Sequence, residues 1–270
     1  MTHVRGSLIV IGGHEDKQGD RVILREVAGR AGPGGKLVVA TVASSEPEIY
    51  WEEYQRVFRA LGVRHVHHLD VRSRAEALAD RTVRVLEGAT AVFFTGGDQL
   101  RIASELGNTP VYDRLCAIYE VGGTIAGTSA GASMMCETML VRGEEERSAR
   151  LGAALVMAPG LGFVKNAIID QHFAQRGRIG RLLGAVAHNP RVLGIGIDEN
   201  TAAIFERAHL TVLGENAVYV VDGSMATYSN IAEEEEDRAL ALFGVRLHVL
   251  SQGSRFELAS REPVASAGAM

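Results

Sequence analysis

The sequence predicts an α/β protein with a largely parallel central sheet flanked by helices on both faces, and two observations carry that prediction. In the first half of the chain, short and almost wholly apolar runs alternate with amphipathic stretches of about 10 to 15 residues. This alternation is typical of strand–helix–strand units around a parallel sheet that is covered on both sides. In the second half, shorter apolar runs are separated by turn residues, which predicts antiparallel strands attached to the same sheet or packed beside it.

The elements of the first half are placed by their composition and by the glycines that end them. Runs rich in valine and isoleucine favour strands, and Gly62 and Gly88 follow expected helices. The aromatic residues Tyr50, Tyr54 and Phe58 recur at helical spacing. The expected strands are Ser7–Ile11, Lys36–Val42, Arg64–Leu69 and Thr90–Thr95, and the expected helices are Asp20–Arg30, Pro47–Leu61, Ala75–Glu87 and Pro110–Glu120.

The second half follows a different pattern, in which turn residues such as Asp222-Gly223 separate the apolar runs. No linker, internal repeat or low-complexity segment divides the chain, so we expect one domain over residues 1–270, with a mobile tail from Arg261. The acidic run Glu233–Glu236 is expected to begin an exposed helix. The expected strands are Leu193–Ile197, Ala202–Glu206, Leu210–Leu213, Ala217–Val221 and Met225–Ser229.

Charge and cysteine content exclude several classes of protein. The formal net charge is -5, so the chain has no overall basic field of the kind that nucleic-acid binders use. The two cysteines, Cys116 and Cys136, are too few for a disulfide framework and lack metal-binding spacing. No apolar stretch is long enough to span a bilayer, and no signal peptide precedes the first strand. We therefore expect a cytoplasmic protein that binds neither nucleic acid nor membrane.

The stretch from Gly122 to Ala132 carries the clearest sign of chemistry. An apolar strand ends in Gly127-Thr128-Ser129-Ala130-Gly131, and a helix is expected to start near Ala130. A serine between two glycines at a strand-to-helix junction is the pattern of a nucleophile elbow, which exposes the hydroxyl above the sheet. The N-terminus of the helix offers unpaired N–H groups to a developing oxyanion. The alternative is a glycine-rich turn whose serine only caps the helix.

Other glycine-rich segments follow expected strands in the same way. Gly12-Gly13 comes after the first strand, and Gly96-Gly97-Asp98-Gln99 comes after the fourth. Ligands of parallel sheets bind beyond the carboxyl ends of the strands. The sequence therefore predicts a site at this edge of the sheet.

A serine nucleophile needs a base, and His172 stands out among nine histidines because of its surroundings. It lies in Asp170-Gln171-His172-Phe173, and Arg176, Arg178 and Arg181 follow closely. Beside Asp170 and His172 these arginines would form a local positive pocket able to bind carboxylates in a forked geometry. The alternative is a solvated basic helix.

The base in turn needs a carboxylate to orient it. Asp198 and Glu199 follow a buried strand and would point to opposite faces, so at most one of them can serve, and composition does not say which. The run Glu144, Glu145 and Glu146 supplies rival acids, although it resembles solvated surface. His14, in the loop after the first strand, could also reach the site.

Five motifs run in order along about residues 8 to 205. They are Ile-Gly-Gly-x-Glu-Asp-Lys at 11–17, Gly-Gly-Asp-Gln at 96–99, Gly-Thr-Ser-Ala-Gly at 127–131, Asp-Gln-His-Phe-x-x-Arg-x-Arg-x-x-Arg at 170–181 and Gly-Ile-Asp-Glu-Asn at 196–200. Together they resemble cyanophycinase, a serine exopeptidase family related to bacterial aspartyl dipeptidase. The fold that we expect is flavodoxin-like, similar to that of class I glutamine amidotransferases.

The resemblance implies hydrolysis of cyanophycin, a poly-aspartate backbone with arginine on each β-carboxyl, to β-Asp-Arg dipeptides. It implies that Ser129 is the nucleophile, His172 the base and Glu199 the orienting acid, with no metal or organic cofactor. It also implies a homodimer. The implied oxyanion hole consists of the backbone N–H groups of Gly97 and Ala130, and the implied substrate pocket is lined by Gln99, Asp170, Gln171, Arg176, Arg178 and Arg181.

Three other functions fit parts of the pattern. A dipeptidase for α-linked Asp-x peptides would keep Ser129, His172 and Glu199 but would not need the arginines, whose presence favours the polymer. An esterase of the α/β-hydrolase type expects the order serine, acid, histidine, which only Glu144–Glu146 would restore. A non-catalytic module of the same fold would bind amino acids or amide ligands.

Overall fold

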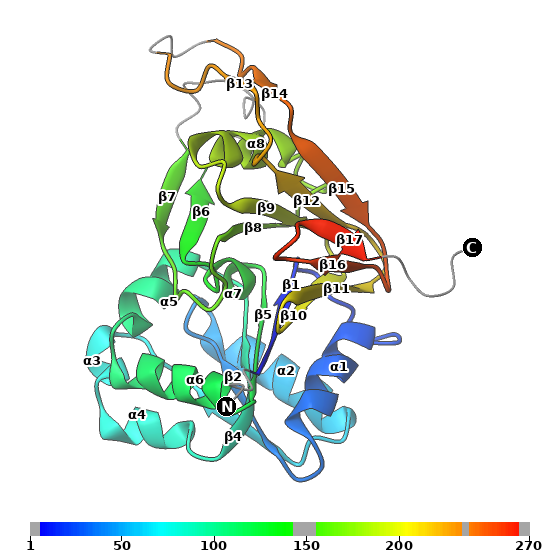
Figure 1. Ribbon diagram of the computed structural model, residues 1–270. Helices are drawn as coiled ribbons and strands as arrows, with labels where there is room; N and C mark the ends of the chain where they lie inside the picture. Colours follow the sequence, from blue (N-terminus) through cyan, green and yellow to red (C-terminus); the bar gives the residue numbers. More distant parts are fainter. Residues whose placement is uncertain (1–5, 143–154, 234–237, 265–270) are drawn as a thin grey trace.

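The computed structural model describes residues 6–142, 155–233 and 238–264, and within them a nine-stranded sheet with helices on both faces forms the centre of the molecule (Figure 1). One half of this sheet is parallel, in the order β1-β5-β4-β2-β3. The other half is antiparallel, in the order β17-β16-β11-β10, and joins the parallel half where β10 pairs with β1. The predicted fold class is confirmed.

Successive side chains of each strand point to opposite faces of this sheet, and different helices cover each face. Ile9 and Ile11 pack with α1 and α2, whereas Leu8 and Val10 pack on the opposite side with α5 and α6. The parallel strands are β1 (Ser7–Ile11), β2 (Lys36–Ala40), β3 (His65–Leu69), β4 (Ala89–Phe94) and β5 (Thr124–Thr128). The antiparallel strands are β10 (Thr201–Glu206), β11 (His209–Gly214), β16 (Arg255–Glu257) and β17 (Glu262–Val264). The helices are α1 (Val22–Ala31), α2 (Pro47–Ala60), α3 (Arg74–Ala77), α4 (Asp80–Val85), α5 (Gln99–Leu106), α6 (Pro110–Glu120) and α7 (Ala130–Ser133).

A second, four-stranded sheet lies above the first in Figure 1, in the order β15-β12-β9-β8. Its strands β8 and β9 are parallel and are joined through helix α8, and the other pairs are antiparallel. These elements are β8 (Ala167–Gln171), α8 (Ile179–His188), β9 (Leu193–Ile197), β12 (Val218–Asp222) and β15 (Arg246–Leu250). Two short hairpins complete the described chain, β6 (Thr138–Arg142) with β7 (Val156–Pro159) and β13 (Tyr228–Ser229) with β14 (Leu242–Phe243).

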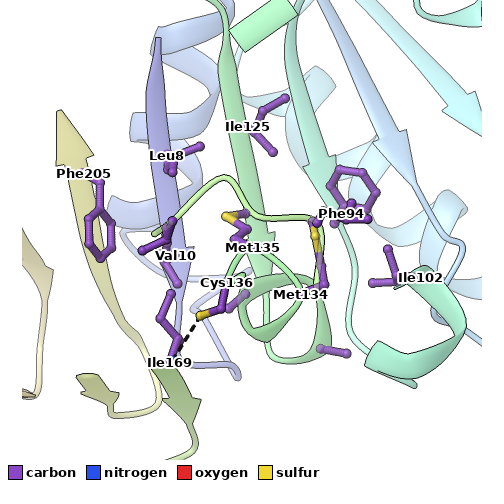
Figure 2. Packing of buried hydrophobic residues seen from close by; sticks show 14 of the residues in the cluster. Leu8, Val10, Phe94, Ile102, Ile125, Met134, Met135, Cys136, Ile169 and Phe205 are labelled. Atoms are coloured by element: carbon purple, nitrogen blue, oxygen red, sulfur yellow. Dashed lines mark hydrogen bonds between the residues drawn. The ribbon is translucent and has the colours of Figure 1, made fainter. Parts of the chain in front are cut away.

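One hydrophobic cluster connects the two sheets. Figure 2 shows Val10 of the main sheet and Ile169 of the second sheet in this cluster, together with Met135 and Cys136 from the segment after α7. The backbone N–H of Ile169 donates to Cys136 Sγ at 3.1 Å, which fixes β8 against that segment. The single domain that the sequence predicts requires a shared core of this kind.

The structure corrects several expected elements. The helix expected over 75–87 is two short helices, because Ala79 has an extended backbone and Asp80 starts a new turn. The sequence analysis missed α5, although Asp98 caps it by accepting the N–H of Leu100. The antiparallel strands expected in the second half are divided between the two sheets, and only Tyr228–Ser229 of the strand expected over 225–229 is a strand.

The C-terminal prediction is wrong for residues 261–264. Strand β17 pairs with β16, and the Arg261 guanidinium bonds the buried Asp222 carboxylate at 2.6 Å. Most of the expected helix at Glu233–Glu236 lies outside the described residues, as do Glu144, Glu145 and Glu146. Among the described residues, no helix combines the length and the apolarity that crossing a bilayer requires.

Candidate active site

The turn after β5 holds Ser129 in a strained conformation. Its φ is 53° and its ψ is -111°, a combination that costs free energy for a residue with a side chain, and its N–H donates to Ile11 O at 3.0 Å. The flanking glycines are sterically required. A Cβ at Gly127 would lie 2.2 Å from Gly131 O, and a Cβ at Gly131 would lie 2.6 Å from Phe94 O. The sequence therefore forms a sharp elbow here.

His172 faces this elbow from the end of β8. Its Nε2 lies 3.0 Å from Ser129 Oγ, and its backbone, with φ of 48°, is fixed by an N–H bond to Gly12 O at 2.8 Å. Gly13 makes room for the imidazole, because a Cβ there would lie 2.3 Å from the ring. The glycine pair after β1 thus positions the histidine.

Glu199 completes a hydrogen-bonded relay. Its Oε1 lies 2.6 Å from His172 Nδ1, and its backbone N–H donates to Gln175 Oε1 at 3.1 Å. Asp198, which residue types alone left as an alternative, has a different environment. Its carboxylate accepts the backbone N–H groups of Ala174 at 2.9 Å and Ala217 at 3.3 Å, so it ties neighbouring segments together.

The environment favours the neutral form of His172. Burial lowers the pKa of the imidazole below its ordinary value, and the nearby positive charge of Arg176 acts in the same direction. The hydrogen bond to Glu199 opposes this effect but does not reverse it. A neutral imidazole whose Nδ1 is bonded to a carboxylate presents Nε2 to the serine hydroxyl as a proton acceptor.

His14 borders the relay without closing it. Its Nδ1 is 3.9 Å from Glu199 Oε2, and its ring meets the His172 ring edge-on at 5.2 Å between centroids. His14, His172 and Glu199 bring three possible metal-ligand atoms within 4.8 Å of one another. Two of these residues already bond to each other through His172 Nδ1, so a metal ion there would disrupt the relay.

The two residues expected to form an oxyanion hole lie beside the serine. Gly97 lines the same cavity as Ser129, and Ala130 is the first residue of α7. Gly97 has a φ of 140°, and a Cβ there would lie 2.1 Å from Ala43 O, so no other residue fits. That the two backbone N–H groups bind an oxyanion stays a prediction.

A cavity of about 850 Å³ opens at the relay. Of the residues expected to bind substrate, Gln171 and Arg176 line it. The amide Oε1 of Gln171 is buried and has no hydrogen-bond partner within the described part of the chain. The full lining consists of His14, Glu15, Asp16, Lys17, Gln18, Glu46, Ile49, Tyr50, Glu53, Tyr54, Gly96, Gly97, Thr128, Ser129, Gln171, His172 and Arg176.

Asp170, Arg178 and Arg181 instead form a buried cluster, which we call the Asp170 cluster. Arg181 Nε donates to Asp170 Oδ2 at 2.6 Å, and Arg181 Nη2 donates to the other oxygen. Arg178 Nη1 donates to Gln171 O at 2.7 Å and lies 3.3 Å from Asp170 Oδ1. All three residues are buried and none lines the cavity. The structure therefore replaces the expected open basic pocket with an internal ion pair. Gln99 is also buried, and its amide donates to Leu140 O at 3.1 Å.

The sequence analysis missed a buried network behind the elbow. Glu15 accepts hydrogen bonds from the Tyr54 hydroxyl and from Thr128 Oγ1, the latter at 2.5 Å. Burial and the Glu15 charge raise the pKa of Tyr54 well above its ordinary value, so its hydroxyl stays a donor. Because Thr128 precedes Ser129, this network anchors the elbow to α2 and to the loop after β1. The motif at 11–17 contains Glu15, which was its only signal in the sequence.

Comparisons with known proteins identify the family of this chain. The family model described as peptidase family S51 matches residues 8–213. A cyanophycinase of Geminocystis herdmanii is 38% identical over 267 residues, which are 97% of this chain and 97% of that protein. A cyanophycinase of a Nostoc species is 42% identical over 258 residues, which are 94% of this chain and 86% of that protein.

Solved structures show the same fold at lower identity. A peptidase from an acI-B1 actinobacterium superposes with a TM-score of 0.72 at 20% identity, covering 94% of this chain and 98% of that one. A protein described as a putative peptidase E from Listeria monocytogenes superposes with a TM-score of 0.55 at 17% identity, covering 78% of this chain and 100% of that one. The family match extends over the strands that carry Ser129, His172 and Glu199, and the chain therefore belongs to peptidase family S51.

Proposed function

We propose that this peptidase is a serine-type exopeptidase that hydrolyses cyanophycin, multi-L-arginyl-poly-L-aspartate, to β-Asp-Arg dipeptides. The observation that carries the proposal is the hydrogen-bonded relay from Ser129 through His172 to Glu199. Two relatives that are 38% and 42% identical to this chain over most of its length are cyanophycinases, which supports the choice of substrate.

The relay supports acyl transfer through a covalent intermediate. Neutral His172 would take the proton from Ser129 Oγ as the oxygen attacks the aspartyl main-chain carbonyl, and Glu199 would stabilise the resulting imidazolium. The N–H groups of Gly97 and Ala130 would hold the oxyanion. His172 would then give its proton to the leaving amine. A water molecule, activated by the same histidine, would release the acyl group from Ser129. Each step uses this chain's own groups, so no metal or organic cofactor is needed.

In this proposal some of the expected binding residues touch the substrate, and the others hold those residues in position. Arg176 and Gln171 line the cavity, so they would contact substrate, with Arg176 pairing with the α-carboxylate of a substrate arginine. Four buried residues that do not line the cavity would act as positioning residues: Asp170, Arg178, Arg181 and Gln99. In particular, Arg178 holds the carbonyl of Gln171, and so orients that residue toward the cavity.

We also propose that the enzyme is a cytoplasmic homodimer. Both cysteines are free, as is usual in a reducing compartment. Leu247 and Val249 are exposed on β15, an edge strand of the second sheet, and a second copy could cover them. Light scattering of the purified protein tests the dimer, and the mass of a single chain would contradict it.

Incubation of the purified protein with cyanophycin and, separately, with α-Asp-Arg tests the function, with products identified by mass and linkage. Release of β-Asp-Arg from the polymer is expected, and it should vanish in Ser129→Ala. Cleavage of α-Asp-Arg alone would favour an α-linked dipeptidase. No turnover of either substrate, with no labelling of Ser129 by a serine-directed reagent, would favour a binding module.

A further inference from the structure

Most of the carboxylates that line the active-site cavity have partners within the protein. Four carboxylates, those of Glu15, Asp16, Glu46 and Glu53, line it. Glu15 accepts two hydroxyl hydrogen bonds, and Glu53 lies 3.0 Å from Lys17 Nζ. Asp16 accepts three backbone N–H groups, which lower its pKa.

Glu46 is the exception. Among the described residues, no hydrogen bond or ion pair involves its carboxylate, although its backbone N–H donates to Ser44 Oγ at 2.9 Å. An anionic group thus faces the cavity without a partner. Arg176 is its cationic counterpart on the same cavity, since no described residue pairs with its guanidinium. The cavity therefore presents one unmatched charge of each sign.

The neighbours of Glu46 form an unusual surface. Ile49, Tyr50 and Glu53 lie on one face at the start of α2, and Glu46, the residue just before this helix, lines the same cavity. Ile49 is 60% exposed there, although it is a large apolar residue. The Tyr50 ring is half-buried and stacks on Tyr54 at 6.5 Å and 17° between planes, which fixes its orientation.

We propose that this face, the α2 slot (Glu46, Ile49 and Tyr50), binds the arginine side chain of the substrate. An arginine side chain combines apolar methylenes with a planar cation that favours both carboxylates and aromatic faces. Glu46 accepts hydrogen bonds from the guanidinium, Tyr50 offers its ring, and Ile49 covers the methylenes. The unmatched carboxylate and the exposed isoleucine both gain partners in the complex. This inference rests on the proposed function, because it assigns the part of cyanophycin that the slot recognises.

The slot is tested by removing the charge of Glu46 and the charge of the substrate side chain, separately and together, and comparing kcat/KM. The substrates are β-Asp-Arg oligomers and matched oligomers in which citrulline, a neutral analogue, replaces arginine. The enzymes are wild type, Glu46→Gln and a control, Glu48→Gln. Glu48 lies two residues after Glu46, in the first turn of α2, but pairs with Arg72 and does not line the cavity. The Ser44 contact of Glu46 uses only its backbone, so Glu46→Gln should fold normally.

Wild type and Glu48→Gln should prefer arginine over citrulline by roughly 10- to 150-fold in kcat/KM, the range for a hydrogen bond to a charged group. Glu46→Gln should lose most of that preference, because its kcat/KM on the arginine oligomer falls toward its kcat/KM on the citrulline oligomer. An unchanged preference in Glu46→Gln would overturn the slot even if the polymer is cleaved. Absence of cleavage by the wild type would instead refute the proposed function, and the inference with it.

Discussion

The cavity beside Ser129 and the Asp170 cluster are both rich in charge, and only one residue separates Asp170 from His172 along the chain. The two regions differ in whether their charged side chains are paired within the protein. In the Asp170 cluster, arginines and carboxylate are buried and bond one another. In the cavity, Arg176 and Glu46 face open space. A buried ion pair positions the backbone around it, whereas an unmatched charge at a cavity is available to a ligand.

This contrast predicts that mutations in one region reduce turnover and mutations in the other reduce stability. Changes in the relay should abolish turnover and spare folding, because Ser129 and Glu199 are partly accessible and serve the reaction. Changes in the Asp170 cluster should reduce stability first, because removal of one partner strands a buried charge. Activity per folded molecule and free energy of unfolding therefore distinguish the two regions.

The largest effect is expected for Ser129→Ala. Loss of the attacking oxygen should lower kcat for dipeptide release by roughly 10⁵- to 10⁶-fold, as for serine nucleophiles in general. The unfolding temperature should stay close to that of wild type, because alanine retains the backbone and removes only a hydroxyl at the cavity. Retained turnover, measured by mass spectrometry of released dipeptide, would refute the nucleophile.

Glu199→Gln should be next in size. The amide keeps the shape of the side chain but not the charge that stabilises protonated His172, so kcat should fall roughly 10³- to 10⁴-fold. Asp198→Asn is the matched control, since Asp198 holds only backbone N–H groups. Comparable losses of kcat in the two variants, at equal folded fraction, would argue against Glu199 as the orienting acid.

Asp170→Asn should act mainly on stability. It leaves Arg181, which makes two hydrogen bonds to the Asp170 carboxylate, buried beside a neutral group, and this should cost about 3–5 kcal/mol of unfolding free energy in urea titration. The double variant Asp170→Asn/Arg181→Met should lose less than the sum of its single variants, because the two residues interact directly. A stable Asp170→Asn protein with a raised KM would restore the expectation that these residues contact substrate.

The sequence predicted those parts of the site that local pattern determines. The elbow at Ser129 follows from its glycines, and His172 and the Asp198-Glu199 pair follow two strands, β8 and β9, that are parallel neighbours. The choice of Glu199 over Asp198 came from the family resemblance and not from the pattern. The burial of Arg178 and Arg181 depends on how α8 and β8 pack in the second sheet, which no local pattern encodes. The contact of Glu15 with Thr128 joins residues 113 positions apart, and so it was invisible to spacing arguments.

The smallest predicted effect concerns pH and connects the cavity charges to the relay. Because burial and Arg176 lower the pKa of His172, the base is neutral above a pH that lies below the ordinary imidazole value, and kcat/KM should rise through that pH to a plateau. Arg176→Ala removes a positive charge that disfavours imidazolium, so the acidic limb should move to higher pH. Rates on a small activated ester, which does not need Arg176 for binding, isolate this shift. Lys17→Ala is the control, since Lys17 pairs with Glu53 and should leave the limb in place. A limb that moves to lower pH in Arg176→Ala would show that its guanidinium does not act on His172 through charge.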